Sequence, residues 1–234
     1  MEGESRLELT IEWHYITKSK QEITWRSEAI PAAHAYTLVL DMENTGRTKH
    51  IVMTDEHDST WTLKELKKYL KSLETEPSEV EVYFDGGFHR EEKLAGLGIV
   101  VYYKQNGKNY RLRTNRLAEY LTSNNEAEYA ALNLAVEQLE EMGVHHQKVK
   151  IYGDSQVVIN EMNGEWAVTD SVLTTWADKI DAKLQKLGIR PHYEYIDRKL
   201  NGEADQLANQ ALQEIEIYAD IDVQKSRKKK GDLS

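Results

Sequence analysis

The sequence contains no cysteine among its 234 residues. This absence excludes disulfide bonds, thiolate zinc sites and a cysteine nucleophile. The chain also lacks any apolar run long enough to span a bilayer, and no signal-peptide hydrophobic segment follows Met1. We therefore expect a soluble, cytoplasmic protein with no membrane partner.

The chain also has no excess of basic residues. The chain has 30 Lys and Arg residues against 40 Asp and Glu residues, which gives a formal net charge of −10. Such a charge disfavours long-range attraction to a polyanion. Any nucleic-acid binding must therefore come from local basic groups and from metal ions. The length and the 40% hydrophobic fraction predict a globular protein of one large or two small domains.

The pattern divides near residues 71–78, where periodicity is lost and a proline occurs. Residues 1–75 predict a small N-terminal α+β unit of unknown role, with strands within 7–16, 21–27 and 49–54 and helices over Pro31–Glu43 and 60–73. Residues 79–218 predict a second, catalytic domain. Residues 223–234 form a basic tail, interpreted as disordered; electrostatic contact with nucleic acid is the alternative.

The second part predicts the element order βββαβααβα. Asn106-Gly107 indicates a hairpin turn, and glycines at 143 and 188 end helices. Because helices separate the later strands, those strands are expected to lie parallel. The expected strands cover 80–84, 96–103, 110 onward, 148–152 and 192–196, and the expected helices cover 125–142, 155–162, 172–187 and the segment after Asn201.

Four carboxylates stand out by their positions. Asp85 and Asp154 follow strand-like runs, whereas Glu128 and Asp205 lie near the starts of helix-like runs. Carboxylates that converge at strand ends and helix starts repel one another unless a hard divalent cation neutralises them. The pattern therefore predicts a metal-dependent phosphodiester hydrolase.

Each carboxylate also has an ordinary interpretation. Asp85 is typical of a turn at a strand end, Asp154 of a helix N-cap, and Asp205 of a helix first turn. Glu128 shares its helix stripe with apolar residues and is the better ligand candidate. Glu126 heads a more mixed stripe, so we expect it to be more exposed and to serve as a helix N-terminal charge.

The sequence resembles type 1 ribonuclease H in four motifs and in their order. They are DGG at Asp85, NNxxE at the start of the long helix, DSQ at Asp154 and AD-x-LA at Asp205. The resemblance covers roughly residues 80–217. It is greatest to bacterial, reverse-transcriptase-like members with an extra N-terminal segment. It implies an α/β fold with a mixed five-stranded sheet flanked by helices. It also implies an endonuclease that hydrolyses the RNA strand of RNA–DNA hybrids, with two Mg²⁺ or Mn²⁺ ions held by Asp85, Glu128, Asp154 and Asp205.

Substrate contacts follow from the same resemblance. Asn124, Asn125 and Gln156 match residues that read the minor groove, and Ser123 matches a phosphate-pocket hydroxyl. Helix capping is the alternative for the two asparagines. The glycines Gly86 and Gly87 would let the substrate backbone come close.

Three departures from the family pattern matter. Residues 163–181 are short and not basic where many members carry a Trp-rich basic handle, so we expect Trp166 and Trp176 to be core residues. The loop before Asp205 has no His, and Arg198 or Lys199 is the candidate for its positive charge. The N-terminal unit does not resemble the family's hybrid-binding module. These departures leave two alternatives: a weak or inactive nucleic-acid-binding module, or a DNA nuclease of the same fold.

Overall fold

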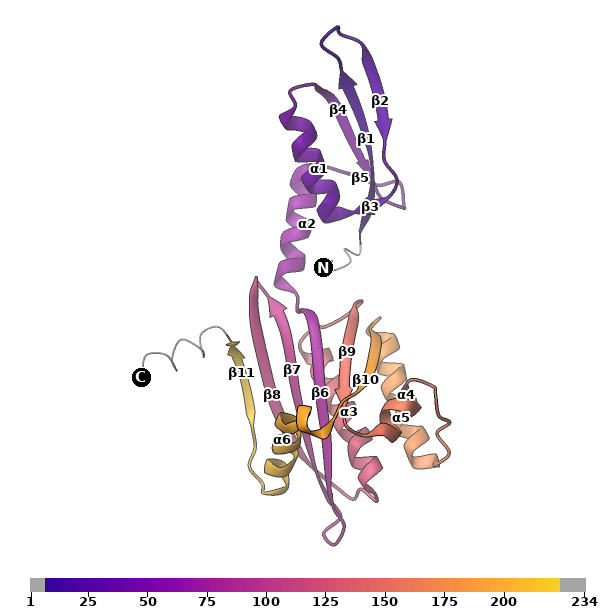
Figure 1. The fold of residues 1–234 in the computed structure, drawn as a ribbon, viewed down its shortest axis with the longest axis vertical. Coiled ribbons are helices and arrows are strands. Elements are labelled where there is room, and N and C mark those ends of the chain that lie inside the picture. The colour runs from indigo at the N-terminus through magenta and orange to yellow at the C-terminus, as the bar shows by residue number, and fades with distance from the viewer. Residues whose placement is uncertain (1–6, 224–234) are drawn as a thin grey trace, which may run out of the picture. The chain divides into compact units, whose positions relative to one another are not determined.

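The computed structural model describes residues 7–223, and the chain divides into two compact units, Met1–Thr75 and Glu76–Ser234 (Figure 1). The predicted basic tail lies outside the described residues from 224 onward. No helix within residues 7–223 is long and apolar enough to cross a membrane.

The first unit is an antiparallel sheet packed against two helices. Strand β1 (Glu8–Ile16) pairs with β2 (Glu22–Arg26), β3 (Ile30–Pro31) and β4 (Thr48–Thr54), and β4 pairs with β5 (Thr60–Trp61). Helices α1 (Ala32–Asn44) and α2 (Leu63–Thr75) bury a core that includes Leu9, Ile11 and Leu66. The short strands β3 and β5 were not predicted.

Helix α2 begins later than its sequence pattern suggests. Thr62 and Glu65 form a reciprocal capping box, in which the Thr62 N–H donates to Glu65 Oε2 at 2.9 Å and the Glu65 N–H donates to Thr62 Oγ1 at 3.2 Å. The two residues before this cap, Thr60 and Trp61, are therefore free to pair with β4 as β5.

The second unit is built on a mixed sheet in the order β10-β9-β6-β7-β8-β11. Strand β9 is parallel to β6 and β10, and the other pairs are antiparallel. The predicted α/β class and mixed sheet are confirmed. The elements are β6 (Ser78–His89), β7 (Leu94–Gln105), β8 (Lys108–Glu119), α3 (Asn124–Glu141), β9 (Lys148–Gly153), α4 (Gln156–Met162), α5 (Ser171–Lys186), β10 (Arg190–Tyr195), a 3-10 turn (Arg198–Leu200), α6 (Gly202–Leu212) and β11 (Tyr218–Asp222).

The sixth strand, β11, was not expected. It pairs with the outer edge of β8, and the side chain of Asn115 fixes its approach. Asn115 Nδ2 donates to the Ile215 carbonyl at 2.9 Å, and its Oδ1 accepts from the Ile217 N–H at 2.8 Å. This tertiary contact explains why the strand's own short sequence gave no clear signal.

The two faces of the sheet are covered by different helices (Figure 1). Alternation along β7 directs Val101 into the core that contains α3 and Val100 into a smaller cluster with α6. The β7–β8 turn has positive φ at Asn106 (52°) and Gly107 (70°), as the predicted hairpin requires. The sheet thus holds α3 and α6 on opposite sides of β6, the strand that carries Asp85.

Candidate functional site

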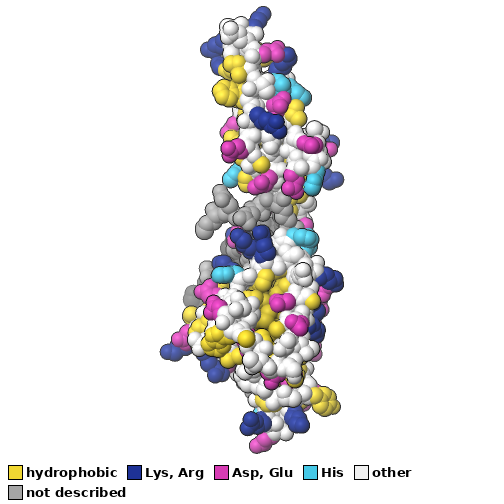
Figure 2. All heavy atoms as spheres, turned by 90° about the vertical axis from the view of Figure 1, so that its right-hand side faces the viewer, with side chains coloured by type: hydrophobic (Ala, Val, Ile, Leu, Met, Phe, Trp, Pro, Cys, Tyr) yellow, Lys and Arg dark blue, Asp and Glu magenta, His cyan; other side chains and the backbone are white. Residues whose placement is uncertain are grey.

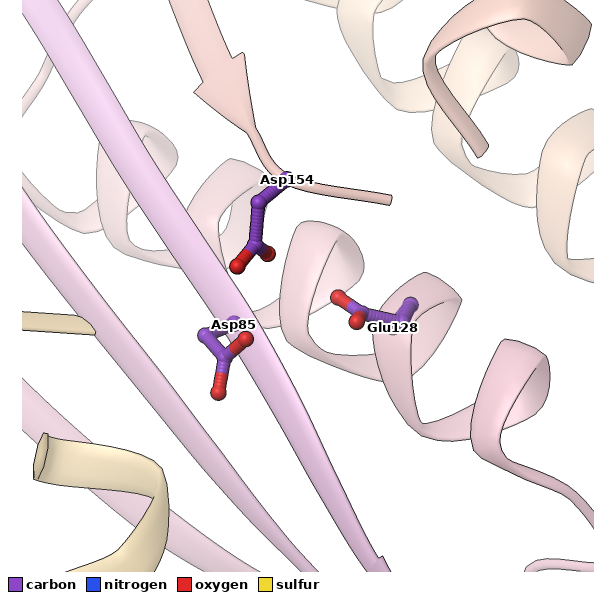
Figure 3. A group of neighbouring side chains, drawn as sticks. All are labelled: Asp85, Glu128 and Asp154. Carbon is purple, nitrogen blue, oxygen red and sulfur yellow. The ribbon is translucent and has the colours of Figure 1, made fainter. Parts of the chain in front are cut away.

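Three of the four predicted carboxylates meet in the second unit. Asp85 comes from β6, Glu128 from α3 and Asp154 from the segment after β9, and Figure 3 shows their carboxylates pointing toward one another. One oxygen of each lies within 4.8 Å of the others. Asp85 and Glu128 are 7% and 6% exposed, whereas Asp154 is half-buried.

A glycine allows this close approach of strand and helix. A Cβ at Gly86 would lie 2.3 Å from the Ala127 carbonyl carbon, so only glycine lets α3 pack so near β6. The Gly86 N–H also donates to Glu128 Oε2 at 3.2 Å. At Gly87, a Cβ would instead meet Leu212 of α6 at 3.4 Å. The close packing of α3 and this hydrogen bond explain why position 86 requires glycine. Contact of Gly86 and Gly87 with the substrate backbone stays a prediction.

The local electrostatics disfavour three ionised carboxylates. Burial, followed by the charges of Asp154 and Asp205, raises the pKa of Asp85 to about 7. Burial, followed by the charges of Asp85 and Asp154, raises the pKa of Glu128 to about 9. Oxygen ligands that repel one another at this spacing fit a hard divalent cation such as Mg²⁺ or Mn²⁺.

Asp205 lies outside the group of three but influences it. Its side chain is 27% exposed and forms an ion pair with Arg198 Nη2 at 2.8 Å. It also accepts a hydrogen bond from Asn209 Nδ2 at 3.1 Å. Because its charge helps to raise the pKa of Asp85, Asp205 acts on the same site from α6. The Arg198 side chain is 78% exposed, and its nearest acidic partner is Asp205.

One residue of the site was missed by the sequence analysis. Asn201 is 1% exposed, and its Nδ2 donates to the Phe84 carbonyl at 2.9 Å and to Asp154 Oδ1 at 3.2 Å. It therefore joins the middle of β6 to Asp154 and holds that carboxylate in place. An asparagine directly before a helix reads as a cap, but this side chain makes no capping hydrogen bond.

The predicted substrate contacts lie at two helix N-termini. Ser123 caps α3, because its Oγ accepts from the Glu126 N–H at 3.1 Å. Asn124 is exposed and Asn125 is half-buried in the first turn, so neither is the cap residue. Gln156 is the exposed first residue of α4.

The N-cap of α4 is Ser155, whose Oγ accepts from the Val158 N–H. Asp154 therefore does not serve as the helix cap, which was its ordinary interpretation. Its carboxylate is directed toward the acidic group instead (Figure 3).

Two expectations about neighbouring side chains are wrong. Glu126 is buried, with 7% exposure, because the Thr122 N–H and Oγ1–H donate to Glu126 Oε2, both at 2.7 Å. Trp176 Nε1 donates to the other carboxylate oxygen of Glu126, Oε1, at 3.3 Å. A capping network thus allows burial that the mixed stripe did not suggest. Trp166 is 48% exposed and is no core residue, since it follows the short α4 in the connection to α5. Trp176 is half-buried against the core.

Known proteins share this arrangement. Residues 83–211 match the family described as "Reverse transcriptase-like". The chain is 43% identical over 195 residues to "Uncharacterized protein YpeP" of Bacillus subtilis (strain 168), which covers 82% of this chain and 86% of that protein.

Solved structures agree with the sequence match. LC11-RNase H1 in complex with an RNA/DNA hybrid has a TM-score of 0.52 and 27% identity, covering 58% of this chain and 98% of that chain. The N-terminal RNase H domain of rv2228c from Mycobacterium tuberculosis, solved as a fusion with maltose binding protein, has a TM-score of 0.50 and 26% identity, covering 58% and 94%. The chain therefore belongs to the ribonuclease H family, in the group described as reverse transcriptase-like.

Proposed function

We propose that this protein is a ribonuclease H that hydrolyses the RNA strand of RNA–DNA hybrids with divalent metal ions. The observation that carries the proposal is the buried group Asp85, Glu128 and Asp154, with oxygens within 4.8 Å of one another. Among residues 7–223 it is the one cluster of three acidic or His side chains with this ligand spacing. It lies in a fold shared with RNase H1 structures.

The residues proposed to hold the ions are Asp85, Glu128 and Asp154, with Asp205 completing the set from α6. Bound Mg²⁺ or Mn²⁺ supplies two things, a lowered pKa for the attacking water and neutralisation of the leaving 3′ oxygen. Asn201 orients Asp154, and the Gly86 N–H orients Glu128. These hydrogen bonds fix the ligand oxygens before substrate binds, which reduces the reorganisation needed for catalysis.

Ser123, Asn124 and Asn125 lie at the start of α3, ahead of Glu128, and Gln156 begins α4 just after Asp154. The amides of Asn124, Asn125 and Gln156 are suited to the minor groove, where base edges and 2′-hydroxyls are displayed. Ser123 is proposed to contact a phosphate, although its Oγ also caps α3. The exposed guanidinium of Arg198 would add positive charge near the scissile phosphate.

The test uses a labelled RNA–DNA hybrid with and without Mg²⁺ or Mn²⁺, beside the Asp154→Asn variant. We expect metal-dependent shortening of the RNA strand by the wild type and none by the variant. An RNA strand that stays intact with both ions would reject the proposal. The same assay on duplex DNA and single strands separates it from a DNA nuclease of this fold.

A second candidate is a hybrid-binding protein with little or no cleavage. It is favoured by the ion pair between Asp205 and Arg198 at 2.8 Å, which engages the fourth carboxylate without a metal. The connection at 163–170 also contains no Lys or Arg to grip a duplex. This candidate predicts hybrid binding that survives Asp85→Asn, with no RNA shortening under any metal condition.

A further inference from the structure

The first unit exposes an apolar surface that its own helices leave uncovered. Side chains on one face of β1 alternate from the buried Leu9 and Ile11 to the half-buried Trp13 and Tyr15. Across the strands, Trp13 pairs with Trp25 and Ile51, and Tyr15 pairs with Ile23. We call Trp13, Tyr15, Ile23, Trp25 and Ile51 the aromatic surface.

The outer part of the aromatic surface is open to solvent. Trp25 is 60% exposed and Ile23 is 43% exposed, both on β2, the edge strand of the sheet. Trp13 is held in place, because its Nε1 donates to Thr48 Oγ1 at 3.0 Å and its ring meets Tyr15 edge-on at 5.1 Å. The fixed Trp13 and Tyr15 rings support the solvent-facing indole of Trp25, and a ligand with flat rings could stack on that indole.

Basic side chains surround this surface. Arg47 Nη1 donates to the Tyr15 hydroxyl at 2.7 Å, and Lys18 and Lys20 lie in the turn between β1 and β2. Within residues 7–223, no carboxylate forms an ion pair with any of these three, and all three are exposed. In Figure 2, exposed apolar side chains lie close to Lys and Arg side chains at the upper end of this unit.

Two acidic groups near this end already have partners. Glu22 pairs with Lys49 at 2.6 Å, and Glu12 contacts His14 Nε2 at 2.8 Å on the opposite face of the sheet. A local excess of unpaired cations on a chain of net charge −10 needs a specific explanation. Its natural complement is a ligand that combines phosphates with flat unpaired rings.

We propose that the aromatic surface binds single-stranded nucleic acid. An unpaired base would stack on Trp25, and neighbouring phosphates would contact Lys18, Lys20 and Arg47. A single strand is favoured over a duplex, because bases inside a duplex are already stacked and cannot lie on an exposed indole. This assigns a role to a unit that carries none of the carboxylates of the candidate metal site.

The test measures binding of labelled single-stranded RNA and DNA oligonucleotides by fluorescence anisotropy. It uses the full chain carrying Asp154→Asn, with EDTA present, so that binding is read without cleavage. We expect Trp25→Ala to weaken binding roughly tenfold, the scale of one lost base–aromatic stack. The matched control is Tyr218→Ala, which removes a 67% exposed aromatic ring from the second unit and should leave this binding unchanged.

The electrostatic part has its own variant pair. Lys18→Gln with Lys20→Asn should reduce the magnitude of the slope of log affinity against log salt by about 1.4, since each phosphate contact on a single strand contributes about 0.7. The control, Lys67→Gln with Lys68→Gln, removes the same charge from exposed positions on α2 and should leave the slope unchanged.

Three outcomes would overturn this proposal. They are no oligonucleotide binding at all, equal losses in the test and control variants, or an equally Trp25-dependent affinity for fully paired hybrid. A failure to cleave hybrid would count only against the nuclease proposal, since this assay contains no metal. Circular dichroism melts of each variant would show whether a loss of binding reflects unfolding instead.

Discussion

Helix α3 carries two glutamates whose surroundings are opposite. Near its C-terminal half, Glu137 accepts hydrogen bonds from Arg116 Nη1 at 2.9 Å, Asn133 Nδ2 at 2.9 Å and Lys183 Nζ at 3.1 Å. Burial alone would raise its pKa, but these donors together lower the pKa of Glu137 to about 2.

Nine residues earlier, Glu128 faces two other carboxylates. Burial and the charges of Asp85 and Asp154 raise its pKa to about 9. The protein therefore supplies its own cations where a carboxylate stabilises the fold. It supplies one backbone N–H and a distant Arg198 where the carboxylate is proposed to bind metal. A buried carboxylate with a raised pKa and no cationic side chain in contact with it is typical of a functional site, here one suited to bind an external cation.

The largest effect should come from neutralising the metal-site glutamate. Glu128→Gln should lower the rate of hybrid cleavage by roughly a thousandfold, because one charged ligand oxygen is lost. The variant should stay folded, since an amide removes the repulsion from Asp85 and Asp154. Cleavage assays and urea unfolding of the same preparation would test both statements. A wild-type cleavage rate in this variant would show that the Glu128 carboxylate is not needed to bind the catalytic metal.

Metal binding should stabilise the second unit through the same residues. Mg²⁺ or Mn²⁺ at ten times its Kd should add about 1.4 kcal/mol to the free energy of unfolding, by mass action on the folded state. Thermal melts with and without the ion would show a rise of several degrees. The rise should vanish in Asp85→Asn and persist in Glu137→Gln. A rise of equal size in all three proteins would indicate binding elsewhere.

The stability without metal should fall as the pH rises. The folded pKa values of Asp85 (about 7) and Glu128 (about 9) lie above the unfolded values near 4. The folded state therefore binds more protons than the unfolded state between about pH 4 and 9, and the free energy of unfolding decreases across that window. Urea unfolding at pH 5, 7 and 9 in EDTA would measure the slope.

The control for that slope is the double variant Asp85→Asn with Glu128→Gln. It cannot ionise at either position, so its stability should change less between pH 5 and 9 than that of the wild type. If the free energy of unfolding fell equally with pH in the two proteins, other titrating groups would be responsible for the fall.

The sequence predicted the parts of this site that depend on local pattern. The strand end placed Asp154, and the apolar stripe selected Glu128 over Glu126 as the residue that faces the acidic group. The expectation that Asp85 follows a strand end is wrong, because β6 continues through Gly86 and Gly87 to His89, paired with β7. The hairpin at Asn106 and Gly107 also follows from local backbone preference.

The parts that failed depend on tertiary contacts. Glu126 is buried through Thr122 and Trp176, which a helical wheel does not contain. Asn201 acts through Phe84, 117 residues away in the chain, and β11 depends on Asn115. Such partners become visible only when distant segments are placed side by side.

The smallest effect should come from the well-partnered glutamate. Glu137→Gln should lower the free energy of unfolding by about 1 kcal/mol at pH 7, because its side chain is 26% exposed and solvent weakens both ion pairs. The folded pKa of Glu137 lies below its unfolded value of about 4.3, so this stabilisation is present above that pH and is lost as the pH falls toward 2. Urea unfolding of wild type and variant at pH 7 and pH 4 should show the difference narrowing, while hybrid cleavage at pH 7 stays within about twofold. If Glu137→Gln instead abolished cleavage as Glu128→Gln should, the two halves of α3 would not be separable into a structural region and a metal-binding region.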